Sequence, residues 1–168
     1  MTIKIFYKNS KFEKAPSDLI VFVDEKFSIN FLKKHISDKE FSYISELLKN
    51  RDIKKDLLFF EISSIKKIFL ISIKKSLKTS DVENLGAKFY KHMQTSKSNS
   101  YYINSDITNS SIDNFLGYFL HGLKLKSYEF NKYKSKKNKK SIAINVVGNK
   151  HKPSSRSNLR FKAIEEGT

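Results

Sequence analysis

The chain has 168 residues, no cysteine, and 33 lysine or arginine residues against 17 acidic ones, which gives a formal net charge of +16. A chain of this length forms one domain that buries about 70% of its unfolded surface. The absence of cysteine excludes a disulfide scaffold, a thiol nucleophile and a zinc–thiolate site.

The first part of the chain alternates between strand and helix patterns. The apolar runs Ile3–Tyr7 and Leu19–Val23 have strand length, and the second is apolar throughout, as in a strand covered on both faces. The acidic pair at 24–25 is interpreted as a solvated turn, because neighbouring side chains on extended chain diverge. Apolar residues at helical spacing predict a helix over 41–48, with its cap at 37–38.

A hairpin and a second helix are expected next. Leu57–Ile62 and Lys67–Ile71 predict two strands, and the connection between them is short enough for a tight turn. Ser80–Glu83 has capping-box spacing and predicts the start of a helix whose apolar residues run from Val82 to Met93.

The pattern ends with a strand, a helix and a strand. We predict a strand at Tyr101–Ile103, a helix over 112–123 capped by Ser110 or Ser111, and a last strand at Ile142–Val147. Strands that alternate with helices indicate an α/β fold. We expect a three-layer α/β/α arrangement in which helices cover both faces of a mixed sheet.

The C-terminal part has a different composition. Residues 149–158 are polar, include Pro153, and predict a linker. Leu159–Ile164 begins a helical pattern that stops at the end of the sequence without a C-cap. We therefore expect a domain over 1–150, followed over 151–168 by a linker and the truncated start of an interdomain helix.

Motifs for catalysis are scarce. The five glycines form neither Gly-x-Gly-x-x-Gly nor a Walker loop, and the four histidines lack a metal-binding spacing. His121 lies among apolar residues and is interpreted as a partly buried helix histidine. We predict no catalytic and no metal-binding residue in this chain. With no signal-peptide pattern and no apolar run near the ~20 residues that span a bilayer, we expect a soluble, cytoplasmic protein without a membrane partner.

The positive charge is concentrated in one segment. Residues 124–162 carry 13 basic side chains and one acidic one. Tyr128, Phe130 and Tyr133 alternate with lysines there, which suits base stacking beside phosphate contacts but also the packing of a helix end on a sheet. Only three basic residues of the chain are arginine, and the lysine excess also fits AT-rich codons. The candidate nucleic-acid or partner surface consists of Lys132, Lys134, Lys136, Lys137, Lys139 and Lys140.

The same segment carries a family resemblance. Residues 122–137 resemble a stretch late in the N-terminal domain of leucyl (cytosol) aminopeptidases, where a helix ends in a Gly-Leu-x-Leu-x-Ser-Tyr-x-Phe-x-x-Tyr-Lys pattern before a closing strand. Val21–Glu25 resembles the early strand of that domain, and Leu85–Lys88 its glycine-containing helix. Ala163–Thr168 resembles the opening of the helix that leads into the catalytic domain.

The resemblance implies a macro-domain-like fold, with catalysis assigned to a separate domain. In this family the two divalent metals (Zn²⁺ or Mn²⁺) and their ligands belong to a C-terminal catalytic domain, whose Asn-Thr-Asp-Ala-Glu-Gly-Arg motif does not occur here. The resemblance therefore implies no cofactor in this chain and no activity of the chain alone. It implies as partners the protein's own catalytic domain and a homo-hexamer. In some bacterial members the N-terminal domains also contribute to DNA binding.

We therefore expect the non-catalytic N-terminal domain of a cytosolic leucyl aminopeptidase, with a role in assembly or regulation of the hexamer. The parent enzyme would remove N-terminal residues from peptides with two metal ions. A nucleic-acid-binding module that uses residues 124–162 is the alternative, and a pure assembly surface is a third. Macro domains elsewhere bind ADP-ribose, but the low glycine content argues against that activity here.

Overall fold

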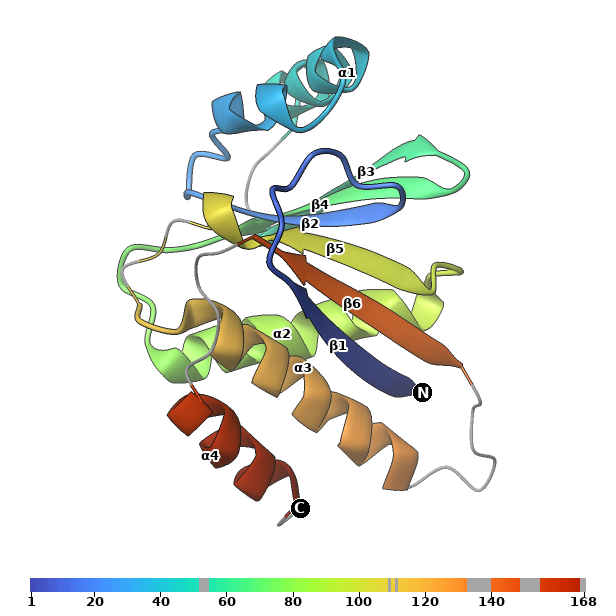
Figure 1. The fold of residues 1–168 in the computed structure, drawn as a ribbon. Helices are drawn as coiled ribbons and strands as arrows, with labels where there is room; N and C mark the ends of the chain where they lie inside the picture. Colours follow the sequence, from blue (N-terminus) through green and yellow to red (C-terminus); the bar gives the residue numbers. More distant parts are fainter. Residues whose placement is uncertain (52–54, 109, 111, 133–139, 149–154, 167–168) are drawn as a thin grey trace.

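The computed structural model describes residues 1–168 except 52–54, 109, 111, 133–139, 149–154 and 167–168. A six-stranded sheet of order β1-β6-β5-β2-β4-β3 forms the centre of the molecule (Figure 1). All neighbouring strands run parallel except β3 and β4, which form an antiparallel hairpin. The strands are β1 (Thr2–Lys8), β2 (Asp18–Val23), β3 (Leu57–Ser63), β4 (Lys66–Ser72), β5 (Ser100–Asn104) and β6 (Ser141–Val147).

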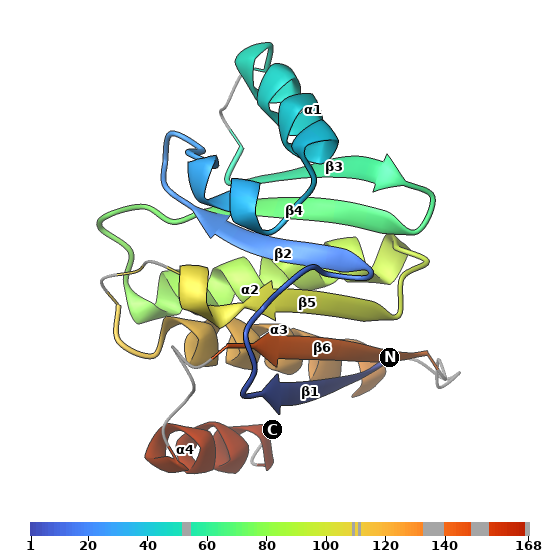
Figure 2. The same cartoon turned by 45° about the horizontal axis from the view of Figure 1, so that its top comes forward.

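Helices cover both faces of the sheet. Helices α2 and α3 pack on one face, α1 lies on the other, and α4 lies beside α3 (Figure 2). The three-layer α/β/α fold expected from the sequence is thereby confirmed. The helices are η1 (Asn30–Lys34), α1 (Asp38–Lys49), α2 (Thr79–Thr95), η2 (Ser105–Ile107), α3 (Phe115–Lys132) and α4 (Ser155–Glu166), where η marks a 3-10 helix.

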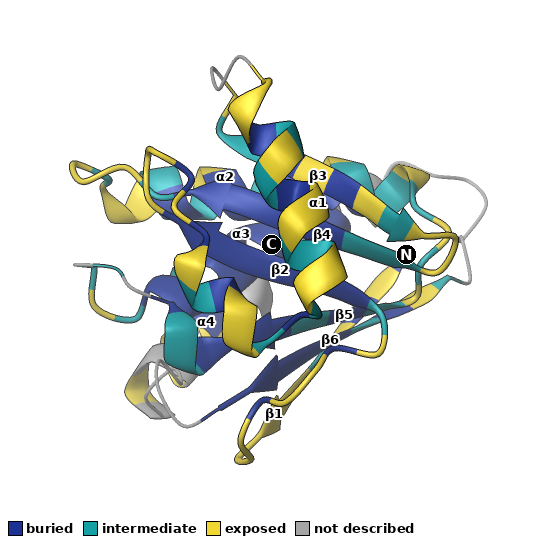
Figure 3. Cartoon of the chain, turned by 90° about the horizontal axis from the view of Figure 1, so that it is seen from above, coloured by how far each residue is buried: buried dark blue, intermediate teal, exposed yellow. Residues whose placement is uncertain are grey.

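Strand β2 separates two apolar cores. All six of its residues are buried, because it is covered on both faces as its apolar run predicts. Ile20 and Phe22 join the core beneath α2 and α3, whereas Leu19 and Val21 join the core beneath η1 and α1. Figure 3 shows the buried central strands below the exposed outer side of α1.

The predicted start of α1 is confirmed, and that of α2 is wrong. The hydroxyl of Ser37 accepts a hydrogen bond from the backbone N–H of Glu40, whose carboxylate accepts one from the N–H of Ser37. Helix α2 instead starts one residue before Ser80, and the backbone N–H of Lys78 donates to the carboxylate of Asp81. Several neighbouring polar residues could act as the N-cap of α2, and their spacing in the sequence does not decide which one does.

Helices α3 and α4 also begin at other positions than predicted. Asn114, with φ of 55°, immediately precedes α3, whereas Ser110 accepts a hydrogen bond from the N–H of Ile112 in the preceding turn. Ser111 lies outside the described residues. Helix α4 begins inside the predicted linker 149–158, because serine and asparagine are common in loops and at helix starts alike.

Candidate functional site

The structure places only part of the predicted basic surface. Lys132 ends α3, with its side chain outside the described part. Lys140 directly precedes β6, and its ammonium donates a hydrogen bond to the backbone carbonyl of Ser96. The structure therefore gives Lys140 an internal role. The other four predicted lysines lie outside the described residues: Lys134, Lys136, Lys137 and Lys139.

The aromatic residues of this segment were expected either to stack bases or to pack on the sheet. Tyr128 is 51% exposed on α3, so the packing interpretation is wrong for this residue. Its neighbour Ser127 is buried and donates a hydrogen bond to the carbonyl of Lys124. The side chains of Phe130 and Tyr133 lie outside the described part of the structure.

Two glycines of the family resemblance lie where α2 and α3 meet. A Cβ atom on Gly86 would lie 2.0 Å from the carbonyl oxygen of Phe119 in α3. A Cβ atom on Gly122 would lie 2.0 Å from the carbonyl oxygen of Glu83 in α2. Each helix therefore presents a glycine to the backbone of the other, and the close contact between them depends on both glycines.

A buried histidine lies beside this helix contact. His121 is 3% exposed, and its Nδ1 lies 2.9 Å from Oε1 of Glu83 on α2. Its ring stacks on Phe161 of α4 at 4.7 Å between centroids, and Tyr118 meets the same phenyl ring edge-on. The sequence predicts a partly buried helix histidine, and the structure buries His121 almost completely where α3 contacts α4.

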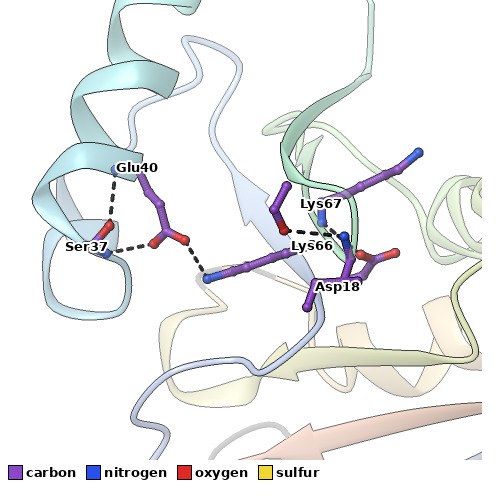
Figure 4. A network of polar contacts seen from close by, with 7 residues as sticks. Asp18, Ser37, Glu40, Lys66 and Lys67 are labelled. Carbon is purple, nitrogen blue, oxygen red and sulfur yellow. Dashed lines mark hydrogen bonds and ion pairs between the residues drawn. The ribbon is translucent and has the colours of Figure 1, made fainter.

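The amino-terminal edge of the sheet contains a buried carboxyl group. Asp18, at the start of β2, is 1% exposed, and its Oδ1 accepts a hydrogen bond from the backbone N–H of Lys67 at 2.8 Å (Figure 4). Burial raises the pKa of Asp18 despite the opposing effect of Lys67. Burial also raises the pKa of the neighbouring Tyr101 to about 12, and the charge of Asp18 acts in the same direction. Folding therefore shifts the titration of Asp18 toward the protonated form, compared with an exposed aspartate.

Lys66, the first residue of β4, connects this edge to α1. The ammonium of Lys66 lies 2.8 Å from Oε1 of Glu40, whose other oxygen caps the helix at Ser37 (Figure 4). Burial raises the pKa of Glu40, but the contacts with Lys66 and Ser37 outweigh it and hold the pKa below its ordinary value of 4.5. A single carboxylate thus joins the helix cap to the sheet.

A cavity of about 550 Å³ lies at the carboxyl ends of β2 and β4. The chain continues from β2 toward β3 and β4, but from β5 toward β6 on the other side of the sheet. In open α/β sheets, ligands usually bind at the carboxyl ends of the strands beside such a reversal. Asp24 lines the cavity, and the carboxylate accepts hydrogen bonds from the N–H groups of Lys26 and Ser28. The hydrogen bond from Ser28 is the main cause of the lowered pKa of Asp24. The predicted acidic turn at 24–25 is confirmed, and its carboxylate is already used within the turn.

Within the described residues, no group of three or more histidine, cysteine, aspartate and glutamate side chains is placed to hold a metal ion. His35 contacts Phe12 and His92 contacts Phe89, and burial lowers the pKa of both imidazoles. His151 lies outside the described part. In the same described ranges, no helix has the length and apolar character that crossing a membrane requires.

The sequence did not predict that Asp18 is buried or that Phe161 packs against His121. Asp18 directly precedes the apolar run Leu19–Val23, and this position is the signal that could have indicated its burial, although aspartate is seldom buried. Phe161 gives no such signal, because its contact with His121 joins segments that lie 40 positions apart and depends on how α4 is placed.

Comparison with known proteins supports the fold. No protein-family model and no curated protein sequence matches the chain. A tomato leucine aminopeptidase mutant matches over 98% of this chain with a TM-score of 0.64 and 16% identity. The macrodomain of Thermus aquaticus DarG matches over 88% of this chain with a TM-score of 0.54 and 11% identity. The chain spans 36% of the aminopeptidase chain and 99% of the macrodomain.

Both matches have the same consequence. At these identities the similarity establishes a fold shared with a macrodomain and with part of a leucine aminopeptidase. The macro-domain-like architecture expected from the sequence is thereby confirmed.

Proposed function

We propose that this chain is the non-catalytic N-terminal domain of a leucine-aminopeptidase-type protein, with a role in the assembly or regulation of the parent oligomer. The observation that carries the proposal is the asymmetric coverage: nearly all of this chain matches about a third of the aminopeptidase. The positions of Gly86 and Gly122 add support, because both residues of the sequence resemblance lie at the contact of α2 and α3.

The proposal is tested first by activity. The purified 168-residue chain is incubated with leucyl-p-nitroanilide and either Zn²⁺ or Mn²⁺, with a known leucine aminopeptidase as positive control. We expect no metal-dependent release of nitroaniline, since catalysis is assigned to another domain. Turnover that follows the protein through two different purification steps would contradict the proposal.

A second test concerns the parent. We expect the coding sequence after Thr168 to contain the Asn-Thr-Asp-Ala-Glu-Gly-Arg motif of the catalytic domain. Adding the 168-residue chain to that domain should increase the hexameric fraction measured by light scattering. The same hexameric fraction with and without the chain would contradict the role in assembly.

Nucleic-acid binding stays the second candidate, because Tyr128 is exposed next to the basic segment. Replacing Lys134, Lys136, Lys137 and Lys139 with glutamine tests it, and Lys140 is left intact because its ammonium contacts Ser96. If the four lysines meet phosphates, the slope of log affinity for duplex DNA against log salt should fall by about 3–4. An unchanged slope, or no binding at low salt, would remove this candidate.

A further inference from the structure

A cavity of about 560 Å³ lies beside the N-terminal half of α2, near the end of β4. Its walls come from α2, from the end of β4 and the segment between β4 and α2, from α3, and from Asp56 directly before β3. Positive side chains predominate among its charged groups. Four lysines and two aspartates line it: Lys74, Lys88, Lys91, Lys126, Asp56 and Asp81.

The two carboxylates are already engaged. Asp56 contacts the ammonium groups of both Lys74 and Lys88, at 3.3 and 3.8 Å. Asp81 accepts the hydrogen bond from the backbone N–H of Lys78 that caps α2. One carboxylate therefore serves two lysines while the other is held at the helix start, and the cavity retains an excess of positive charge.

One part of the cavity wall is apolar. Leu77, Leu85 and Ala87 contribute carbon surface beside the lysines. The volume falls in the range of about 300–1,000 Å³ that small-molecule sites occupy. An ammonium group is a strong point-charge partner for phosphate, and an adjacent apolar wall suits the carbon part of the same ligand.

We propose that this cavity binds a small organic phosphate. Lys88 and Lys91, which lie one turn apart on α2, contact the phosphate groups, and Leu77 and Leu85 contact the carbon part. The N-terminus of α2 is not the source of the affinity, because Asp81 occupies it. The proposal stands independently of the aminopeptidase assignment.

The test uses the 168-residue chain and three probes at low salt: inorganic pyrophosphate, ADP and adenosine. Amide NMR shifts locate binding, and calorimetry gives the affinity. We expect pyrophosphate and ADP to shift amides over 72–91, ADP to bind more tightly than pyrophosphate, and adenosine alone to bind weakest. The double substitution Lys88→Gln/Lys91→Gln should weaken ADP binding by about tenfold or more.

A charge-matched control is Lys39→Gln/Lys49→Gln, because both lysines are exposed on α1, on the opposite face of the sheet. ADP affinity of this variant should stay within about twofold of the parent chain. Equal weakening by both double substitutions, or shifts outside 72–91, would overturn the proposal in favour of diffuse attraction to a basic protein. Equal affinities for ADP and pyrophosphate would overturn the role of the apolar wall.

Discussion

The imidazole of His121 on α3 lies against the phenyl ring of Phe161 on α4, with the ring planes inclined by only 21°. Phe161 is 8% exposed, whereas Leu159 on the same helix is 68% exposed. The aromatic contact thus anchors α4 to the α3 side of the domain. This arrangement gives a first prediction about local stability.

Phe161→Ala should release α4 while leaving the sheet folded. Truncating this buried ring removes its contacts with His121 and Tyr118, and helices of this length are marginal without tertiary packing. We expect amide exchange in α4 to accelerate by about tenfold or more, with β2 and β4 unaffected. Leu159→Ala is the matched control and should leave exchange unchanged. Equal acceleration by both substitutions would show that α4 is not anchored through Phe161.

Gly86→Ala and Gly122→Ala should each destabilise the whole domain. Each added methyl group meets the backbone of the facing helix at 2.0 Å, and backbone cannot rotate away as a side chain does. We expect losses of about 1–3 kcal/mol or more in the free energy of unfolding, measured with urea. Gly117→Ala on α3 is the control, because its methyl group meets the side chain of Asn114. Similar losses at all three positions would instead implicate helix glycines in general.

Asp18→Asn should change how stability depends on pH. The fold raises the pKa of Asp18 above 3.8, so the protonated form is favoured in the folded state, and this contribution is lost as pH rises through the folded pKa. Asparagine keeps an oxygen for the N–H of Lys67 and does not ionise. The variant should therefore gain stability relative to the parent chain as the pH rises above the ordinary pKa of 3.8. Glu25→Gln, at an exposed position, should show no such gain. A stability difference that does not change with pH would contradict the assignment.

Glu40→Gln should have the opposite pH dependence. The folded pKa of Glu40 lies below 4.5, so its stabilising effect is present above that value and is lost as pH falls through the folded pKa. We expect a loss of about 1–2 kcal/mol at pH 7, because the contact with Lys66 is largely shielded from water. Urea unfolding at a series of pH values measures how the loss shrinks toward pH 3. Glu46→Gln on the exposed side of α1 should cost less than about 0.5 kcal/mol.

Local patterns predicted the elements well where one interpretation dominated. The apolar run Leu19–Val23 required cover on both faces, and the structure supplies it with helices on each side. The connection after Ile62 was short enough for a hairpin, and β3 and β4 do pair antiparallel. The cap of α1 was predicted at 37–38, and in the structure Ser37 forms it together with Glu40.

Contacts between segments that lie far apart in the sequence could not be predicted from local patterns. The pattern of residues in a strand does not specify which other strand it pairs with. The position of β6 between β1 and β5 is therefore set by the whole fold. Gly86 and Gly122 were visible in the sequence, but their role depends on the crossing of two helices. The basic surface was inferred from composition, and for Lys140 the structure shows an internal hydrogen bond that composition could not reveal.

The position of β1 beside β6 has a consequence for the order in which the domain folds. Thr2 pairs with Ser141 and Lys8 with Val147, so β1 meets its neighbour β6 only after nearly all of these 168 residues have been synthesised. Until then both edges of β1 are unpaired, and exposed lysines such as Lys4 and Lys8 generally oppose the pairing of a strand with other chains. We therefore expect the pairing of β1 with β6 to be a late step in folding, because it joins residues 139 positions apart.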